Sequence, residues 1–225
     1  MVDTHILHSY PSAATTPNFL REATIEIIPE IDLPKLLATN ALEGIVLSPK
    51  RIAEYELVSL QPRSDESNSG FTREWSGMVD ERIEYSLYLD TPVGFCLTYK
   101  GLPNALGGIA MLDSDEVMLR QLQGVRGKIF DGARPPADTS PIPKTSARGL
   151  MPLDWRKLMV EIMEQVSEST GVSSVAIQSS ANNFWVGQGQ LSTVAAETTY
   201  DRTAQRLGYR KHRFSKKKKD WHKSL

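Results

Sequence analysis

The chain contains a single cysteine, Cys96, among 225 residues, so it cannot form an internal disulfide bond. Such a composition suits a reducing compartment, and we expect a cytoplasmic protein. No apolar run approaches the roughly 18 residues that a membrane-spanning helix needs. The first 24 residues also lack the basic segment followed by an apolar one that marks a secretory signal. We therefore expect neither a disulfide-stabilised secreted domain nor an integral membrane protein.

Histidine is scarce as well, and its placement argues against a metal site. The four histidines lie near the two ends of the chain: His5, His8, His212 and His222. No cysteine–histidine spacing typical of zinc is present, so we expect no metal. Cys96 alternates with apolar neighbours on an extended segment, which predicts a buried small side chain. No histidine and aspartate pattern indicates that Cys96 is an activated nucleophile.

The net charge of −1 conceals an asymmetry between the two parts of the chain. Residues 205–225 hold nine basic residues and one acidic residue, a net charge of +8, so the other 204 residues carry −9. We predict that a basic C-terminal tail, residues 215–225, binds nucleic acid or anionic lipid. The residues expected to make these contacts are Lys216, Lys217, Lys218, Lys219 and Trp221. The alternatives are a solubilising end and a tail held by the acidic body.

The first 81 residues are expected to form an irregular and helical extension that packs on the core. Residues 1–30 carry three prolines and are predicted to be mostly irregular. Residues 31–61 are predicted to hold two helices, because Asp32 and Ser48 each precede a proline that suits a first helical turn. Residues 62–79 are polar and rich in glycine and serine, which predicts an exposed loop.

From residue 82 the apolar period changes to two, which predicts β-strands. Four strands are expected to form an antiparallel meander: residues 82–90, 93–101, 105–113 and 116–125. A proline-rich loop, residues 128–150, follows and is predicted to be mobile or ordered by a ligand. Then come a helix, a strand, a helix and a strand, ending near residue 214. A helix between two strands indicates a parallel crossover, so we predict an α+β core, residues 82–214, with a mixed, mostly antiparallel sheet flanked by helices.

This element order, with its "RLGY" ending, resembles the GNAT N-acetyltransferase fold. The family's phosphate loop, Gln/Arg-x-x-Gly-x-Gly/Ala at the end of its fourth strand, is similar to "QLQGVRG" at residues 121–127, with the second glycine one place late. The resemblance implies that an acyl-CoA lies where the fourth and fifth strands splay apart. The residues implied to bind it are Gln121, Gly124, Val125, Arg126, Gly127, Lys128 and Arg148. The alternative is that the glycines merely end an edge strand.

The same resemblance implies two catalytic residues. Glu116 begins the fourth strand, where the family often places a general base for an amine. The family's general acid is a tyrosine four residues before a glycine, but Ala204 stands there and Tyr200 lies one turn earlier on the same helical face. Tyr200 is therefore the candidate donor to a departing thiolate. The alternatives are a solvated strand end for Glu116 and a core position for Tyr200.

A second resemblance covers most of the chain and concerns the VirK/YbjX-like bacterial proteins. It is carried by "EYSLYLDTPVGFCLTY", a strand ending "LQG", "RGLMPLDWRKLMVEIM" and "TTYDRTAQRLG". This resemblance supports the topology and implies no reaction. Two functions are therefore expected as alternatives. One is an N-acyltransferase that uses acetyl-CoA or another acyl-CoA on an unidentified amine. The other is a non-catalytic binding or regulatory protein on a GNAT-like fold, whose basic tail binds nucleic acid, anionic lipid or a protein partner.

Overall fold

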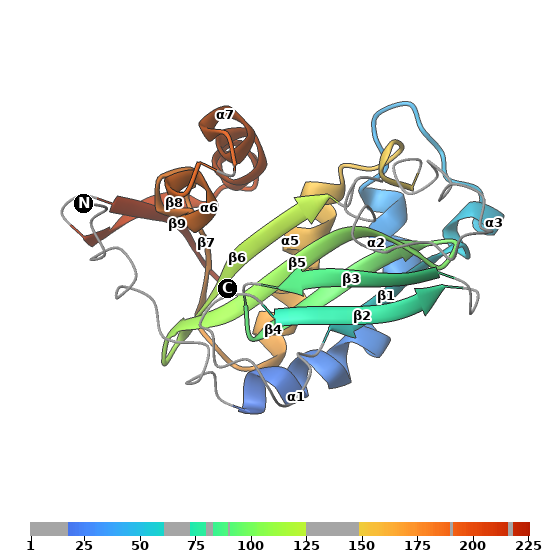
Figure 1. Ribbon diagram of the computed structural model, residues 1–225, viewed down its shortest axis with the longest axis horizontal. Helices are drawn as coiled ribbons and strands as arrows, with labels where there is room; N and C mark the ends of the chain where they lie inside the picture. The colour runs from blue at the N-terminus through green and yellow to red at the C-terminus, as the bar shows by residue number, and fades with distance from the viewer. Residues whose placement is uncertain are drawn as a thin grey trace.

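A computed structural model describes residues 18–60, 73–79, 83–89, 91–124, 149–189, 191–215 and 218–225. These residues form a mixed seven-stranded sheet with helices, and a separate two-stranded ladder (Figure 1). The predicted α+β fold with a mostly antiparallel sheet is confirmed. Most of the predicted proline-rich loop, up to residue 148, lies outside the described residues.

The seven strands lie in the order β1-β4-β5-β6-β7-β9-β8, and only β6 and β7 run parallel. Their bounds are β1 Tyr55–Leu60, β4 Val93–Tyr99, β5 Leu102–Asp113, β6 Glu116–Gly124, β7 Ser174–Ile177, β8 Arg210–Ser215 and β9 Lys218–Ser224. The separate ladder pairs β2 Arg73–Val79 with β3 Ile83–Leu89. In Figure 1, β7, β9 and β8 lie on the left of the molecule and turn away from β4–β6.

The helices divide between the N-terminal region, the crossover between β6 and β7, and the segment between β7 and β8. Their bounds are α1 Asn18–Ile27, α2 Leu33–Thr39, α3 Pro49–Ile52, α5 Trp155–Ser169, α6 Phe184–Gly187, α7 Thr193–Ala196 and α8 Arg202–Arg206. A π-helical segment, Glu197–Asp201, joins α7 directly to α8. Within the described ranges, no helix is both long and apolar enough to cross a membrane.

Helix α5 packs against β5, β6 and β7, and α1 packs against α5 and β4. The predicted apolar stripe of α5 is confirmed, because all its members are fully buried: Leu158, Met159, Ile162, Met163 and Val166. Gly171 follows the helix with φ +74°, as a C-terminal cap requires. One hydrophobic cluster includes residues from Leu20 in α1 to Trp221 in β9. The N-terminal helices therefore share a core with the sheet.

The two predicted helix starts in the N-terminal region are confirmed. The Asp32 side chain accepts a hydrogen bond from the backbone N–H of Lys35, and the Ser48 hydroxyl accepts one from Arg51. The second helix, however, ends after one turn, and Tyr55–Leu60 forms β1 instead of helix. Pairing with β4 supplies the backbone hydrogen bonds and therefore outweighs a weak helical pattern.

Three other expectations about this half of the chain are wrong. Residues 18–27 form helix α1 where an irregular segment was predicted. Residues 73–79 form strand β2 where an exposed loop was predicted. The predicted four-stranded meander has only three members, β4, β5 and β6, because β3 pairs with β2 along its whole length. β3 thus has β2 as its partner and lies outside the seven-stranded sheet.

The predicted basic tail is also wrong, because Lys218–Ser224 is strand β9. It lies inside the sheet, antiparallel to both β7 and β8. Two of its residues, Asp220 and Trp221, are buried. Lys216 and Lys217 lie outside the described residues. The C-terminal segment is therefore a structural strand of the fold and not a free arm.

Candidate functional site

The sheet opens where the parallel strands β6 and β7 separate. They pair over four residues, from Glu116 opposite Ser174 to Leu119 opposite Ile177. The backbone N–H of Gln178 still donates to the Leu119 carbonyl at 3.0 Å, and then β7 ends. Strand β6 continues to Gly124. In the described part of the chain, this last half of β6 therefore has no strand partner on the β7 side.

Tyr200 reaches into this opening. Its hydroxyl oxygen accepts a hydrogen bond of 3.1 Å from the backbone N–H of Leu122, and its side chain is buried. Tyr200 lies in the π-helical segment that joins α7 to α8. Single π-helical turns are rare and often occur at functional sites. The opening thus brings together a backbone N–H and a phenol. A backbone N–H can stabilise negative charge on a reacting oxygen, and a phenol can donate a proton to a leaving group.

The chain that leaves β7 carries buried polar groups, two of which bond to β9. The Asp220 carboxylate is fully buried and accepts hydrogen bonds from the Ser179 N–H at 2.8 Å and from Asn182 Nδ2 at 2.6 Å. Gln178 Nε2 donates to the Asn182 carbonyl at 2.9 Å. Among the described residues, no hydrogen-bond partner faces Ser179 Oγ or Asn182 Oδ1. Buried polar atoms normally have such partners, so these two can receive a water or ligand group.

Asp201, next to Tyr200, fixes the π-helical segment in place. Its carboxylate accepts hydrogen bonds from Trp221 Nε1 at 2.6 Å, from the Ser180 N–H at 3.3 Å and from the Ser180 hydroxyl. The Trp221 ring is buried and lies 4.8 Å from Lys211 Nζ. It is not accessible for stacking on a base or entering a bilayer, so its predicted contact with a polyanion is wrong. The structure gives Trp221 a positioning role instead.

Glu116 lies at the other end of β6. Its carboxylate accepts a hydrogen bond from Ser174 Oγ at 2.9 Å and lies 2.7 Å from His222 Nδ1, so it links β6, β7 and β9. Leu122 is six positions further along the strand, a distance of roughly 20 Å at ~3.3 Å per residue. The structure therefore does not bring the two predicted catalytic residues, Glu116 and Tyr200, together.

Gly124 ends β6 beside the first turn of α5. A Cβ atom there would lie 3.2 Å from the Trp155 ring and 3.4 Å from Leu150. The Trp155 ring therefore lies beside the glycine, and any side chain at this position would contact it. Gln121 is buried, and its Nε2 donates to Gln123 Oε1 at 3.2 Å. The remaining predicted phosphate ligands lie outside the described residues: Val125, Arg126, Gly127, Lys128 and Arg148.

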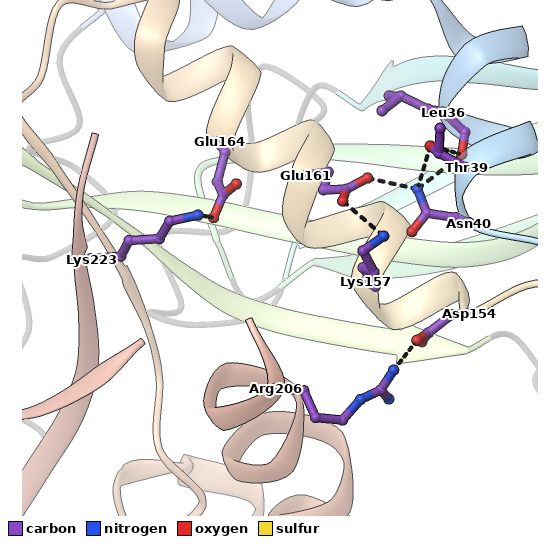
Figure 2. A network of polar contacts seen from close by, with 9 residues as sticks. All are labelled: Leu36, Thr39, Asn40, Asp154, Lys157, Glu161, Glu164, Arg206 and Lys223. Carbon is purple, nitrogen blue, oxygen red and sulfur yellow. Dashed lines mark hydrogen bonds and ion pairs between the residues drawn. The ribbon is translucent and has the colours of Figure 1, made fainter. Parts of the chain in front are cut away.

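Polar contacts hold α5 against three other elements (Figure 2). Its Glu161 accepts a hydrogen bond of 2.6 Å from Asn40, which directly follows α2. Asp154, which precedes the helix, pairs with Arg206 of α8. Near the other end, Lys223 of β9 lies 2.8 Å from a Glu164 oxygen. Arg206 is largely exposed, and an ion pair with an exposed partner is worth about 0–1 kcal/mol, so the main effect of that pair is to orient the helix.

The pKa values of Tyr209 and Cys96 are raised, so both side chains stay protonated near neutral pH. Burial raises the pKa of Tyr209, and the neighbouring Glu164 carboxylate, which accepts its hydroxyl hydrogen bond at 2.8 Å, raises it further. Burial likewise raises the pKa of the Cys96 thiol to about 12. The prediction that Cys96 is a buried side chain is confirmed. Neither group supplies a nucleophile or a proton donor near neutral pH.

Cys96 provides a reporter of the folded state. We expect a thiol reagent such as 5,5′-dithiobis(2-nitrobenzoate) to leave native Cys96 unmodified, because the thiol is buried and holds its proton. Denaturant should release one equivalent of reactive thiol, since the chain has no other cysteine. Absorbance of the released chromophore measures both states. Rapid labelling without denaturant, under conditions where the protein remains folded, contradicts this burial.

Comparison with known proteins adds no relative. The chain matches no family model, no curated protein and no solved structure. Among the described residues, no group of three or more histidine, cysteine, aspartate or glutamate side chains is arranged to hold a metal ion. The function is therefore argued from the geometry of the opening between β6 and β7.

Proposed function

We propose that the protein is a cytoplasmic, acyl-CoA-dependent N-acyltransferase of the GNAT type that acts on an amine. The observation that carries the proposal is the meeting of the Leu122 N–H and the Tyr200 hydroxyl where two parallel strands part. The strand order supports it. In the resembled fold the pantetheine arm enters between the fourth and fifth strands, and the meander β4–β6 with β1 makes β6 and β7 the fourth and fifth strands of this sheet.

The proposed chemistry uses these two groups in sequence. The thioester carbonyl accepts the Leu122 N–H, which stabilises negative charge on that oxygen during attack. Displaced from this N–H, the Tyr200 hydroxyl donates its proton to the departing thiolate as the C–S bond breaks. The amine nitrogen forms the new C–N bond and loses a proton to solvent. Because Glu116 is distant, the amine enters in its neutral form, so the rate rises with pH towards the amine pKa.

Binding of the cofactor phosphates is assigned to the end of β6 and the start of α5. The proposal keeps Arg126, Lys128 and Arg148 as charged partners of the pyrophosphate. Helix α5 has 15 residues, and its positive N-terminal end lies beside Gly124, which supports an anion at this place. The amide groups of the pantetheine arm suit Asn182 Oδ1 and Ser179 Oγ, which lack partners among the described residues.

The test is acyl transfer by Tyr200→Phe. We expect kcat to fall by about 10²–10⁴-fold because the thiolate loses its proton donor. Acyl-CoA affinity should change little. Thiol release from acetyl-CoA and decanoyl-CoA, with a panel of primary amines, measures the rate. The matched control is Tyr209→Phe, which also removes a buried hydroxyl but lies beside Glu164. Equal rates in wild type and Tyr200→Phe contradict the role of Tyr200.

One observation favours a non-catalytic binding protein as the second candidate. Side chains occupy the opening, because Tyr200 takes the Leu122 N–H and Trp155 covers Gly124. Titration calorimetry with acetyl-CoA and decanoyl-CoA separates the two candidates. Binding of either ligand supports the acyltransferase. If wild type binds neither at millimolar concentration, the acyltransferase proposal fails and the binding protein remains. Such a binding protein would not use a free basic tail, because residues 218–224 form strand β9 of the sheet.

A further inference from the structure

Exposed apolar side chains gather in the loop between α2 and α3 and in the segment that leads into α5. Seven large apolar side chains are exposed in the described part of the chain, and four of them belong to this region: Leu42, Ile45, Val46 and Met151. Val46 is 94% exposed and Met151 is 71% exposed. Contact of apolar surface with water is unfavourable, and contiguous patches of this kind mark binding sites.

The patch contains a cavity of about 430 Å³. Among the residues that the structure describes, its lining consists of Ile45, Met151, Pro152 and Arg51, three apolar side chains and one guanidinium. This volume lies in the range of small-molecule sites, about 300–1,000 Å³, which are mostly apolar with a few polar groups that orient the ligand. The lining therefore predicts a ligand with a long apolar part and a single anionic group.

The two walls of the cavity are fixed to each other. One wall is the loop between α2 and α3, and the other is the segment that leads into α5. Ala41 and Leu153 form an antiparallel bridge. The Leu42 N–H donates to the Pro152 carbonyl at 2.9 Å, and the Asp154 N–H donates to the Asn40 carbonyl at 2.8 Å. These hydrogen bonds preorganise the cavity, which lowers the entropic cost of binding.

Arg51 brings positive charge to the cavity wall. It lies in the single turn of α3, next to Lys50. Its guanidinium carbon is 5.8 Å from the centre of the Tyr99 ring, and this contact limits its motion. A guanidinium carries its positive charge whatever other groups it contacts, and its planar fork of N–H donors matches the geometry of a carboxylate or phosphate. The charge of the wall is thus complementary to an anionic head group.

We propose that this cavity binds an amphiphilic anion with one aliphatic chain, of which a fatty-acid carboxylate is the simplest example. The chain lies against Ile45, Met151 and Pro152, and the head group pairs with Arg51. The cavity is open on one side and has its charge on the wall, an arrangement that suits a single aliphatic chain with a charged head group. The alternative is that the loop between α2 and α3 inserts into a bilayer. That mode of binding would use the exposed apolar side chains but not the cavity.

The probe is dodecanoate, added below its micelle-forming concentration to the full-length protein in a titration calorimeter. We expect saturable binding at one site. Affinity should rise by up to about fourfold for each added methylene from octanoate to dodecanoate, since each buried methylene contributes a fixed increment. Dodecyl maltoside, which has the same chain and an uncharged head, should bind at least about tenfold more weakly because it cannot form the charge-assisted pair.

Two variants locate the site. Met151→Glu places a negative charge at the cavity and should weaken dodecanoate binding by about tenfold or more. Its matched control is Val194→Glu, which makes the same change at a 69% exposed position on α7 and should bind as wild type does. Arg51→Gln should remove the preference for dodecanoate over the maltoside. Thermal melting confirms that each variant is folded before its affinity is compared.

Several results overturn the proposal. No dodecanoate binding to wild type, or equal binding by Met151→Glu, excludes this cavity. Equal affinity for the maltoside excludes anion recognition. Binding to phosphatidylglycerol vesicles without binding of monomeric dodecanoate assigns the patch to a membrane surface. Dimerisation that Met151→Glu abolishes, with no bound dodecanoate, assigns it to a second copy of the chain. The proposal does not depend on acyl transfer, which the Tyr200→Phe assay tests separately.

Discussion

A chain that ends after Lys217 is expected to be unfolded. This truncation removes β9, which lies between β7 and β8 and pairs with both. It also removes Trp221 from the core and the Asp220 carboxylate that holds the Ser179 N–H and the Asn182 amide. Loss of an internal strand leaves two unpaired edges and buried donors without acceptors. Each such donor costs about 1–3 kcal/mol, and a domain has only about 5–15 kcal/mol of stability in total.

Circular dichroism and size-exclusion chromatography measure this outcome. We expect no cooperative thermal transition and an expanded or aggregated species. The control chain ends at Ser224 and lacks only Leu225, whose N–H donates to the Ser173 carbonyl at 3.0 Å. It should fold, with a loss of about 0.5–1.5 kcal/mol for that hydrogen bond. A truncated protein that melts cooperatively at the wild-type temperature contradicts the assignment of β9 as an internal strand.

The core helix was predictable from the sequence because burial on one side imposes a period, and β4–β6 were predictable because they are apolar along most of their length. The stripe from Leu158 to Val166 repeats as one face of α5, and β4–β6 consist of apolar segments between turn residues. Strand β9 was not predictable in this way. Asp220 and Trp221 are adjacent and both buried, so polarity does not alternate along the strand. The groups that bond to the buried Asp220 carboxylate come from Ser179 and Asn182, which are distant in the sequence and meet it only when the chain folds.

The candidate site was predictable only in part. Tyr200 as a candidate follows from the resemblance, and the structure adds its contact with the Leu122 N–H of β6. That contact uses a backbone N–H, which no residue type reveals in a sequence. The π-helical segment that carries Tyr200 likewise has no sequence pattern. The resemblance implied Glu116 because it begins the fourth strand. In the structure Tyr200 contacts Leu122, further along the same strand, so the two residues lie far apart.

Gly107→Ala is expected to destabilise the protein strongly, because the aromatic ring of Phe95 lies directly over Gly107. Gly107 pairs with Phe95 in the ladder between β5 and β4. A Cβ atom on Gly107 would lie 2.4 Å from one carbon of the Phe95 ring and 2.5 Å from another, well inside contact distance. Phe95 is fully buried, so its ring cannot move aside into solvent. Overpacking of this kind costs about 1–3 kcal/mol.

A double-mutant cycle with Phe95→Leu attributes this loss to the ring. Chemical denaturation should show that Gly107→Ala costs less when Phe95 is already leucine, with a coupling of about 0.5–3 kcal/mol. The melting temperature should fall by about 2–4 °C for each kcal/mol of lost unfolding free energy in a chain of this size. Gly187→Ala is the matched control, because a Cβ on this exposed residue of α6 meets nothing within 4 Å. Helix propensity predicts that the control is neutral or gains up to about 1 kcal/mol. Additive losses in the cycle contradict the contact, because independent sites add within about 0.3–0.5 kcal/mol and a shared steric conflict does not.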